Sequence, residues 1–279
     1  MSPPVVFPLT TSAANARVVD VWADNEEAEL ARISQLFRDF PIAVVATYKD
    51  LPPRPVRGAG HLIFRDGVYH VVGLPRDLNY RCYGLHTRVR DARFFQLALA
   101  LLNRDGDVAL GRVWRFNIGP LLAADDRFLV ELGVEPPIRR RIHRDHIGQA
   151  LWACQAVHNP AVTWVTCDGA EDICHLLDCF FKTNVVRVVS DRNNFVWNSR
   201  SFFPQLYDLR ILAEWRTLEG EEPPLSGVRE AGPAALLRAF LALMRGPAFA
   251  HHMKGYNGIL SGVGHLDTPG LVSIYPNTS

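Results

Sequence analysis

Two histidines, His143 and His146, have a spacing that could hold a metal ion on one face of a helix. Side chains three residues apart are neighbours on a helix surface, and imidazole is a common ligand for transition metals. A closed site needs further ligands, and no cysteine lies near this pair in the sequence. We therefore assign no metal site to the two histidines.

The cysteines offer a second possible metal site, but their spacing does not favour it. The chain has five cysteines and contains no Cys-x-x-Cys pair, which is the usual start of a zinc motif. An odd number of thiols in a chain of 279 residues is typical of reduced core residues in a cytosolic or nuclear protein. The zinc interpretation, which we disfavour, would use Cys167, Cys174, His175 and Cys179.

The densest basic run, IRRRIHRDH at 138–146, has two interpretations. Arginines in such a run can bind RNA phosphates, whereas most basic runs form a solvated helix face. The formal net charge is only +1, so no overall basic field supports nucleic-acid binding. Both interpretations stay open, and the solvated face is favoured. The sequence has no Gly-x-Ser-x-Gly elbow, P-loop or dinucleotide fingerprint, which removes three common enzyme classes.

The segment PIAVVATYKD, residues 41–50, predicts a central strand whose end carries no reactive group. Its apolar run from Ile42 to Val45 is suited to a strand that is covered on both faces. Chemistry often lies where such a strand ends. Here the end is Ala46, Thr47 and Tyr48, none of which is a carboxylate.

The elements around this strand alternate between helix and strand, which predicts one α/β domain. The first helix lies within 21–40, where Asp24 is the expected N-cap and Glu27 completes a capping box. Its expected apolar stripe consists of Leu30, Ile33, Leu36 or Phe37, and Phe40. A hairpin is predicted at Asp66-Gly67. The segment 94–109 predicts a strand followed by a turn at 105–106, and further strands are predicted at 113–118 and 161–166. Further helices are predicted near 121–132 and over 143–158, 170–183 and 232–244.

Composition predicts a soluble intracellular protein, with 48% hydrophobic and 21% charged residues. No apolar run approaches the roughly 20 residues of a membrane span. Residues 1–17 lack the basic start of a signal peptide and are expected to form a flexible leader.

Seven segments resemble, in the same order, the Caf-one (Pop-two) deadenylases, the nuclease subunit of the Ccr-Not complex. The resemblance covers 18–264, leaving 265–279 as a tail, and includes the family's glutamine at Gln96. It implies a single RNase H-like domain of the four-carboxylate exonuclease type, an α/β fold in which helices flank a mixed sheet. The segments are VWADNEEAELARISQLFRDFPIAVVAT, RFFQLALALLNRDG, VWRFNI, VTWVTCDGAEDICHLL, FFPQLYDLRIL, EAGPAALLRAFLALM and YNGILSGVG.

The resemblance also implies where catalytic groups belong. The family trims poly(A) tails with two divalent ions about 4 Å apart, which require oxygen ligands. The Asp-x-Glu that ends its first strand corresponds to Ala46 and Tyr48, so a shift to Asp50 is the only rescue there. The family's later His and Asp correspond to Arg229 and Ala234, and an arginine cannot act as a base near neutral pH.

Only the second acidic motif keeps carboxylates. Glu171, two residues after Gly169, matches the family's aspartate, and Asp172 follows it. Glu171 is thus the candidate catalytic residue, and Glu171 with Asp172 the candidate metal ligands. The alternative, which we favour, is that both are acidic first-turn residues stabilised by the helix dipole. Asp208 also keeps the family pattern but lies outside the metal quartet, so a capping or core role is expected.

These substitutions predict a catalytically inactive member of the deadenylase family that acts as a binding or scaffold subunit in mRNA turnover. No cofactor is then expected. The alternative is a residually active poly(A)-specific 3′–5′ exoribonuclease with relocated ligands, which would use Mg²⁺ or Mn²⁺. A stand-alone RNA-binding domain is a third hypothesis. Expected partners are the large Not scaffold, a Ccr-type nuclease and poly(A) RNA, and the expected location is the cytoplasm and the nucleus.

Overall fold

The computed structural model describes the central strands, the helices that cover them and parts of the C-terminal region. Among the described residues, no helix is long and apolar enough to cross a membrane. The described residues are 10–11, 16–49, 61–65, 68–72, 94–119, 140–166, 169–181, 192–209, 257–260 and 264–265, with 212, 237, 240 and 241.

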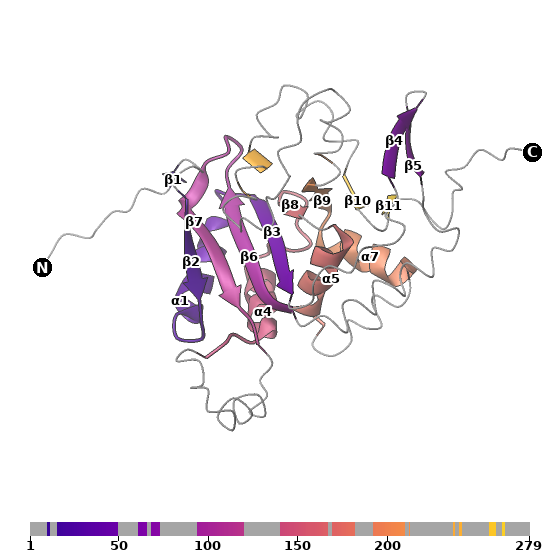
Figure 1. The fold of residues 1–279 in the computed structure, drawn as a ribbon. Coiled ribbons are helices and arrows are strands. Elements are labelled where there is room, and N and C mark those ends of the chain that lie inside the picture. Colours follow the sequence, from indigo (N-terminus) through magenta and orange to yellow (C-terminus); the bar gives the residue numbers. More distant parts are fainter. Residues whose placement is uncertain are drawn as a thin grey trace, which may run out of the picture.

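A seven-stranded mixed sheet forms the centre of the fold (Figure 1). β6 is antiparallel to both of its neighbours, whereas β3, β8 and β9 run parallel to one another. β1 and β2 both pair with the outer edge of β7. In spatial order the strands are β1 (Thr10–Thr11) and β2 (Arg17–Val21), β7 (Val108–Asn117), β6 (Phe94–Leu102), β3 (Ile42–Lys49), β8 (Thr163–Thr166) and β9 (Gln205–Asp208).

The two faces of β3 enter two different apolar clusters, as the sequence predicted. Ala43 and Val45 pack with Trp164 and with side chains of the helices. Ile42, Val44 and Ala46 belong to a second cluster that includes Tyr207, Leu237 and Phe240. Successive side chains of a strand point to opposite faces, so this division means that β3 is covered on both sides. The apolar run of the sequence is therefore confirmed as a central strand.

Four described helices cover the first of these faces, and their apolar stripes supply much of its core. The expected stripe of the first helix is confirmed, because Leu30, Ile33, Leu36 and Phe40 are all buried. Trp164 lies between Phe37 and Phe203, with ring centroids 6.1 and 5.1 Å away. The helices are α1 (Glu26–Leu36), α4 (Arg144–Ala153), α5 (Ala170–Asp178) and α7 (Arg192–Phe202).

Two helix ends differ from the sequence prediction. The N-cap position of α1 is Asn25 rather than Asp24, and no side chain caps the helix. The Asn25 side chain instead accepts from the Trp22 backbone N–H at 2.7 Å and donates to the Asp20 carbonyl, which closes the turn after β2. α4 ends at Ala153 and not at Asn159-Pro160, because Gln155 and then His158 adopt positive φ angles of 56° and 57°.

Several smaller predictions have mixed outcomes. The hairpin is confirmed, since β4 (His61–Arg65) pairs with β5 (Val68–Val72) and Arg65 lies opposite Val68. β10 (Ile259–Leu260) and β11 (Gly264–His265) form a second small pair. The helix near 121–132 and most of 232–244 lie outside the described residues. Thr10–Thr11 belong to the expected leader and pair with β7, and the domain boundaries stay a prediction.

Candidate functional site

The end of β3 carries apolar packing where the resemblance implies carboxylates. Ala46 is 5% exposed and belongs to the same cluster as Ala98 and Tyr207. Tyr48, two residues further along the same face, packs against this cluster. These side chains supply no ligand, and their apolar surroundings disfavour a bound cation, which needs oxygen atoms and water around it.

Thr47, which points to the opposite face, is tied to Asp172 at the start of α5. One oxygen of Asp172 accepts from the Thr47 backbone N–H at 3.0 Å and from its hydroxyl at 2.6 Å. Both residues are 1% exposed. A buried carboxylate is stabilised by such donors, so this pair fixes α5 against the end of β3. The structure thus brings one predicted ligand, Asp172, to the predicted strand end, where it has a structural partner.

Thr47→Val is expected to lower the free energy of unfolding by about 1–3 kcal/mol, because it removes one donor to a buried carboxylate while keeping the side-chain shape. Urea unfolding measures the change. Thr163→Val, at a half-buried position on β8, is the control for replacing a strand threonine. An equal loss in both variants would contradict the assigned role of the Thr47 hydroxyl.

Glu171 lies beside Asp172 in the first turn of α5 and is half-buried. Gly169 precedes the helix with a positive φ of 48°, a conformation that favours glycine. The two carboxylates are at the positive end of the helix dipole, as the favoured interpretation of the sequence requires. Their metal-binding role stays a prediction.

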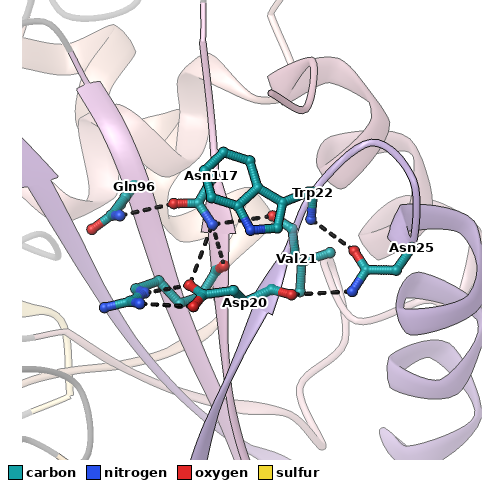
Figure 2. A network of polar contacts seen from close by, with 7 residues as sticks. Asp20, Val21, Trp22, Asn25, Gln96 and Asn117 are labelled. Atoms are coloured by element: carbon teal, nitrogen blue, oxygen red, sulfur yellow. Dashed lines mark hydrogen bonds and ion pairs between the residues drawn. The ribbon is translucent and has the colours of Figure 1, made fainter. Parts of the chain in front are cut away.

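A row of polar side chains crosses the same end of the sheet on the face of Tyr48 (Figure 2). Gln96 lies opposite Tyr48 in the register and donates to Asn117 at 2.8 Å. Asn117 in turn donates to Asp20 at 3.3 Å. Asp20 accepts from Arg115 twice, at 2.6 and 2.8 Å. The row joins β6, β7 and β2, which explains why polar residues are found at this position of a buried sheet.

Arg115 places a permanent positive charge near the end of β3. Its hydrogen bond to Asp20 raises the pKa of the guanidinium, burial opposes this, and the charges of Asp20 and Tyr48 add to the increase. Both oxygens of Asp20 accept from this guanidinium, so the two opposite charges compensate each other. Sequence reasoning missed this pair, although alternation along VWRFN places Arg115 and Asn117 on one face.

An exposed aromatic surface lies on the helical side of the molecule, at the C-terminal ends of α4 and α7. Trp152 is 55% exposed, and its ring centroid is 5.0 Å from that of His158. Phe202 lies 4.4 Å from His158 and joins this surface to the core. We define the aromatic surface as Trp152, His158, Phe180, Phe181 and Phe202.

The aromatic surface continues along α7, and the exposed residues close to it in the described part of the sequence are uncharged. The Ser201 hydroxyl is 3.2 Å from His158 Nδ1, and Trp197, one turn earlier on the same helix face, is 69% exposed. Large exposed aromatic side chains are typical of protein–protein contacts. The sequence signal for Trp152 is that it lies outside the buried stripe of Ile147 and Leu151. Exposed neighbours are Gln149, Ala153, Gln155, Pro160 and Asn194.

The other predicted clusters have structural roles. The His143 side chain accepts from the Asp145 backbone N–H and caps α4, and His146 contacts Glu26 at 2.8 Å. Arg140 and Arg141, in the basic run, are exposed, in agreement with a solvated surface. Of the zinc candidates, Cys174 and Cys179 are buried as free thiols within and just after α5. Phe202, Phe203 and Tyr207 are buried core residues.

The described residues do not fit a two-ion centre. Within the described ranges, no group of three or more His, Cys, Asp or Glu side chains could hold a metal ion. Ala46 and Tyr48 contribute packing instead of ligands, and Asp172 is engaged by Thr47. Arg229 and Ala234 lie outside the described residues, as does Asp50. We therefore derive no catalytic step through a metal ion.

Comparisons with known proteins identify relatives. No family model matches the chain. It is 23% identical over 210 residues to CCR4-NOT transcription complex subunit 7 of Caenorhabditis elegans, a match that covers 72% of this chain and 62%, less than two thirds, of that protein. It is 24% identical over 276 residues to the probable CCR4-associated factor 1 homolog 7 of Arabidopsis thaliana, covering 89% of this chain and 94% of the homolog. The chain is related to the Caf1/Pop2 proteins.

Solved structures of Pop2 and CAF1 have the same fold. The RNase domain of yeast Pop2 aligns with a TM-score of 0.61 at 16% identity, over 95% of this chain and 99% of that one. The structure of the yeast NOT1 MIF4G domain co-crystallised with CAF1 matches with a TM-score of 0.60 at 18% identity. The match covers 90% of this chain and 98% of that one. S. pombe Pop2p, in its Mg²⁺- and Mn²⁺-bound form, aligns with a TM-score of 0.57 at 19% identity. The alignment covers 81% of this chain and 90% of that one. The predicted RNase H-like α/β fold is confirmed.

Proposed function

We propose that this chain is a non-catalytic member of the Caf1/Pop2 deadenylase family, which docks on a NOT1-type scaffold within a CCR4-NOT-type complex. In this role it acts in mRNA turnover, in the cytoplasm and the nucleus, as a binding subunit that occupies the place of an active nuclease. The observation that carries the proposal is the packing of Ala46 and Tyr48 into an apolar cluster where the family resemblance requires two metal ligands.

Two further observations support the loss of catalysis. Asp172 Oδ1 accepts two buried hydrogen bonds from Thr47, so this carboxylate has a structural role in the described part of the chain. Asp20, a carboxylate on the same face as Tyr48, accepts from Arg115 at 2.6 and 2.8 Å and is thus already engaged. A metal-dependent reaction would need ligands to come from elsewhere in the chain, with Glu171 as the starting point.

The aromatic surface supports the docking part of the proposal. It contains Trp152, which is 55% exposed, and among the described residues the exposed ones close to it in the sequence are uncharged. RNA binding would require cationic groups, so this surface is better suited to an apolar protein partner. A related fold is known in a structure of yeast CAF1 with the NOT1 MIF4G domain, which makes that domain the natural probe.

Poly(A) trimming by the purified chain tests the loss of catalysis. With Mg²⁺ or Mn²⁺ we expect intact tails, while an active Caf1 protein shortens them under the same conditions. Glu171→Ala is the matched variant. If the chain shortens tails and Glu171→Ala stops the reaction, the chain is an exoribonuclease with relocated ligands and the proposal is wrong.

Binding to a NOT1 MIF4G domain tests the docking. Trp152→Ala is expected to weaken binding at least tenfold, because truncating a central exposed tryptophan removes a typical hot spot. Val18→Ala, at an exposed position on β2, is the control and is expected to bind as the unmodified chain does. Calorimetry measures both. Equal affinities for the two variants would remove the aromatic surface from the docking proposal.

A further inference from the structure

One asparagine, Asn257, connects the end of α7 with the edge of the sheet. It lies two residues before β10, which runs beside β9, the last described strand on that side of the sheet (Figure 1). Its side-chain oxygen accepts from the Leu206 backbone N–H on β9 at 2.9 Å and from the Arg200 guanidinium on α7 at 3.5 Å. Its side-chain nitrogen donates to the Pro204 carbonyl at 3.3 Å. One side chain thus joins the last turn of α7, the chain after it and β9.

The residues that follow Asn257 fix the segment 257–260 in place. The Gly258 N–H donates to the Leu206 carbonyl at 2.7 Å, so residues 257–258 engage both backbone polar groups of Leu206. Gly258 has a φ of 76°, a conformation that favours glycine. Leu260 is 1% exposed and belongs to the same apolar cluster as Phe202. The segment is therefore attached both to the sheet and to the core.

The last turn of α7 also supplies part of the aromatic surface. The Phe202 ring lies 4.4 Å from His158, and the Phe202 carbonyl accepts from the His158 backbone N–H at 2.9 Å. The Ser201 hydroxyl contacts the His158 ring. Trp152 packs edge-on against His158 and Phe202, with ring centroids 5.0 and 5.8 Å away. The position of this turn therefore determines how the rings of α4 and α7 meet.

We propose that Asn257 is a positioning residue for the aromatic surface, which holds the last turn of α7 in the orientation that binds an apolar protein partner. The binding half of this inference rests on the proposed function. Asn257 is not one of the residues of the aromatic surface and acts through Arg200 and the chain at 204–206. Rings that are already fixed lose less conformational freedom on binding, so Asn257 raises the affinity without adding a contact of its own.

Hydrogen exchange in the free chain tests the positioning without any partner. In Asn257→Ala we expect at least about threefold faster exchange at the N–H groups of Leu206, which loses its acceptor, and of His158, which donates to the end of α7. Unchanged protection of the His158 N–H in this variant would overturn the positioning, even if Leu206 exchanged faster.

Asn103→Ala is the matched control. Asn103 is half-buried like Asn257, and its side-chain oxygen also accepts backbone N–H groups, at 2.8 and 3.0 Å, in the turn between β6 and β7. β3 and β8 separate β6 from β9 in the sheet. This variant should lose a comparable amount of stability in denaturant unfolding, while Leu206 and His158 stay as protected as in the unmodified chain.

Binding of the NOT1 MIF4G domain, measured by calorimetry, tests the effect on docking. Asn257→Ala should bind at least about fivefold more weakly than the unmodified chain, whereas Asn103→Ala should bind equally well. Asn257→Gln keeps the amide but displaces it through its longer side chain, so it should also weaken binding and replaces the alanine variant if that variant does not fold.

Two results would overturn the effect on docking: unchanged affinity in the folded Asn257 variants, or the same loss of affinity in Asn103→Ala. If the unmodified chain does not bind the domain at all, the proposed docking is wrong and the binding half of this inference is wrong with it. The exchange of the His158 N–H in the free chain still decides the positioning in that case.

Discussion

Gly148→Ala lowers the free energy of unfolding by at least about 3 kcal/mol, in our expectation, because the new Cβ has no space. Its ideal position is 2.0 Å from the Cys179 carbonyl oxygen, which is backbone and cannot turn aside as a side chain could. α4 and the chain after α5 would have to separate. This expectation has the opposite sign to the usual effect of the substitution, since alanine stabilises an open helix position by up to about 1 kcal/mol.

Denaturant unfolding followed by circular dichroism measures this change. Gln149→Ala, the next residue of α4 and an exposed one, is the control and should leave stability within about 0.5 kcal/mol. A Gly148→Ala protein as stable as the control would show that the two segments are not in close contact.

Restoring the family's acidic pair should fail to restore a metal site. In the double variant Ala46→Asp with Tyr48→Glu, the first carboxylate enters a position that is 5% exposed among apolar side chains. A buried carboxylate without partners costs several kcal/mol. The variant should therefore unfold at a markedly lower temperature, and Mg²⁺ should not raise that temperature.

Thermal unfolding with and without Mg²⁺ decides this prediction, since a ligand that binds only the folded state stabilises it. Ala98→Asp is the matched control, because Ala98 lies opposite Ala46 in the register and is 3% exposed in the same cluster. The Ala98→Asp protein should lose stability to a similar extent, and Mg²⁺ should not change its melting temperature. An increase in the melting temperature of the double variant alone with Mg²⁺ would mean that the remaining ligands are in place and that only two side chains were lost.

Local patterns in the sequence were sufficient to predict the central strand, the first helix and the hairpin. The run from Ile42 to Val45 predicted a strand covered on both faces, and the two apolar clusters confirm it. The stripe that begins at Leu30 predicted the buried face of α1. Asp66-Gly67 predicted a hairpin whose flanking strands do pair. In each case the signal is a spacing of neighbouring residues, which a strand, helix or turn imposes by its own geometry.

The residues at which helices begin and end were less predictable, because several neighbouring residues could occupy a cap position. Asp24 has the chemistry of an N-cap, but Asn25 takes the position and uses its side chain to close the turn with Trp22. α4 stops before Asn159-Pro160 because positive φ angles at Gln155 and His158 turn the chain. Those turns place His158 on Trp152 and so create the aromatic surface.

The sequence by itself determined the order of the elements, the two-sided burial of β3 and the absence of carboxylates at positions 46 and 48, because these depend on residue type and local spacing. Only the tertiary structure decided what the remaining acidic groups do. Asp172 and Thr47 are 125 residues apart, and Asp20 and Arg115 are 95 apart. No local pattern specifies such pairs, since they form only when parallel and antiparallel strands bring distant segments to one end of the sheet.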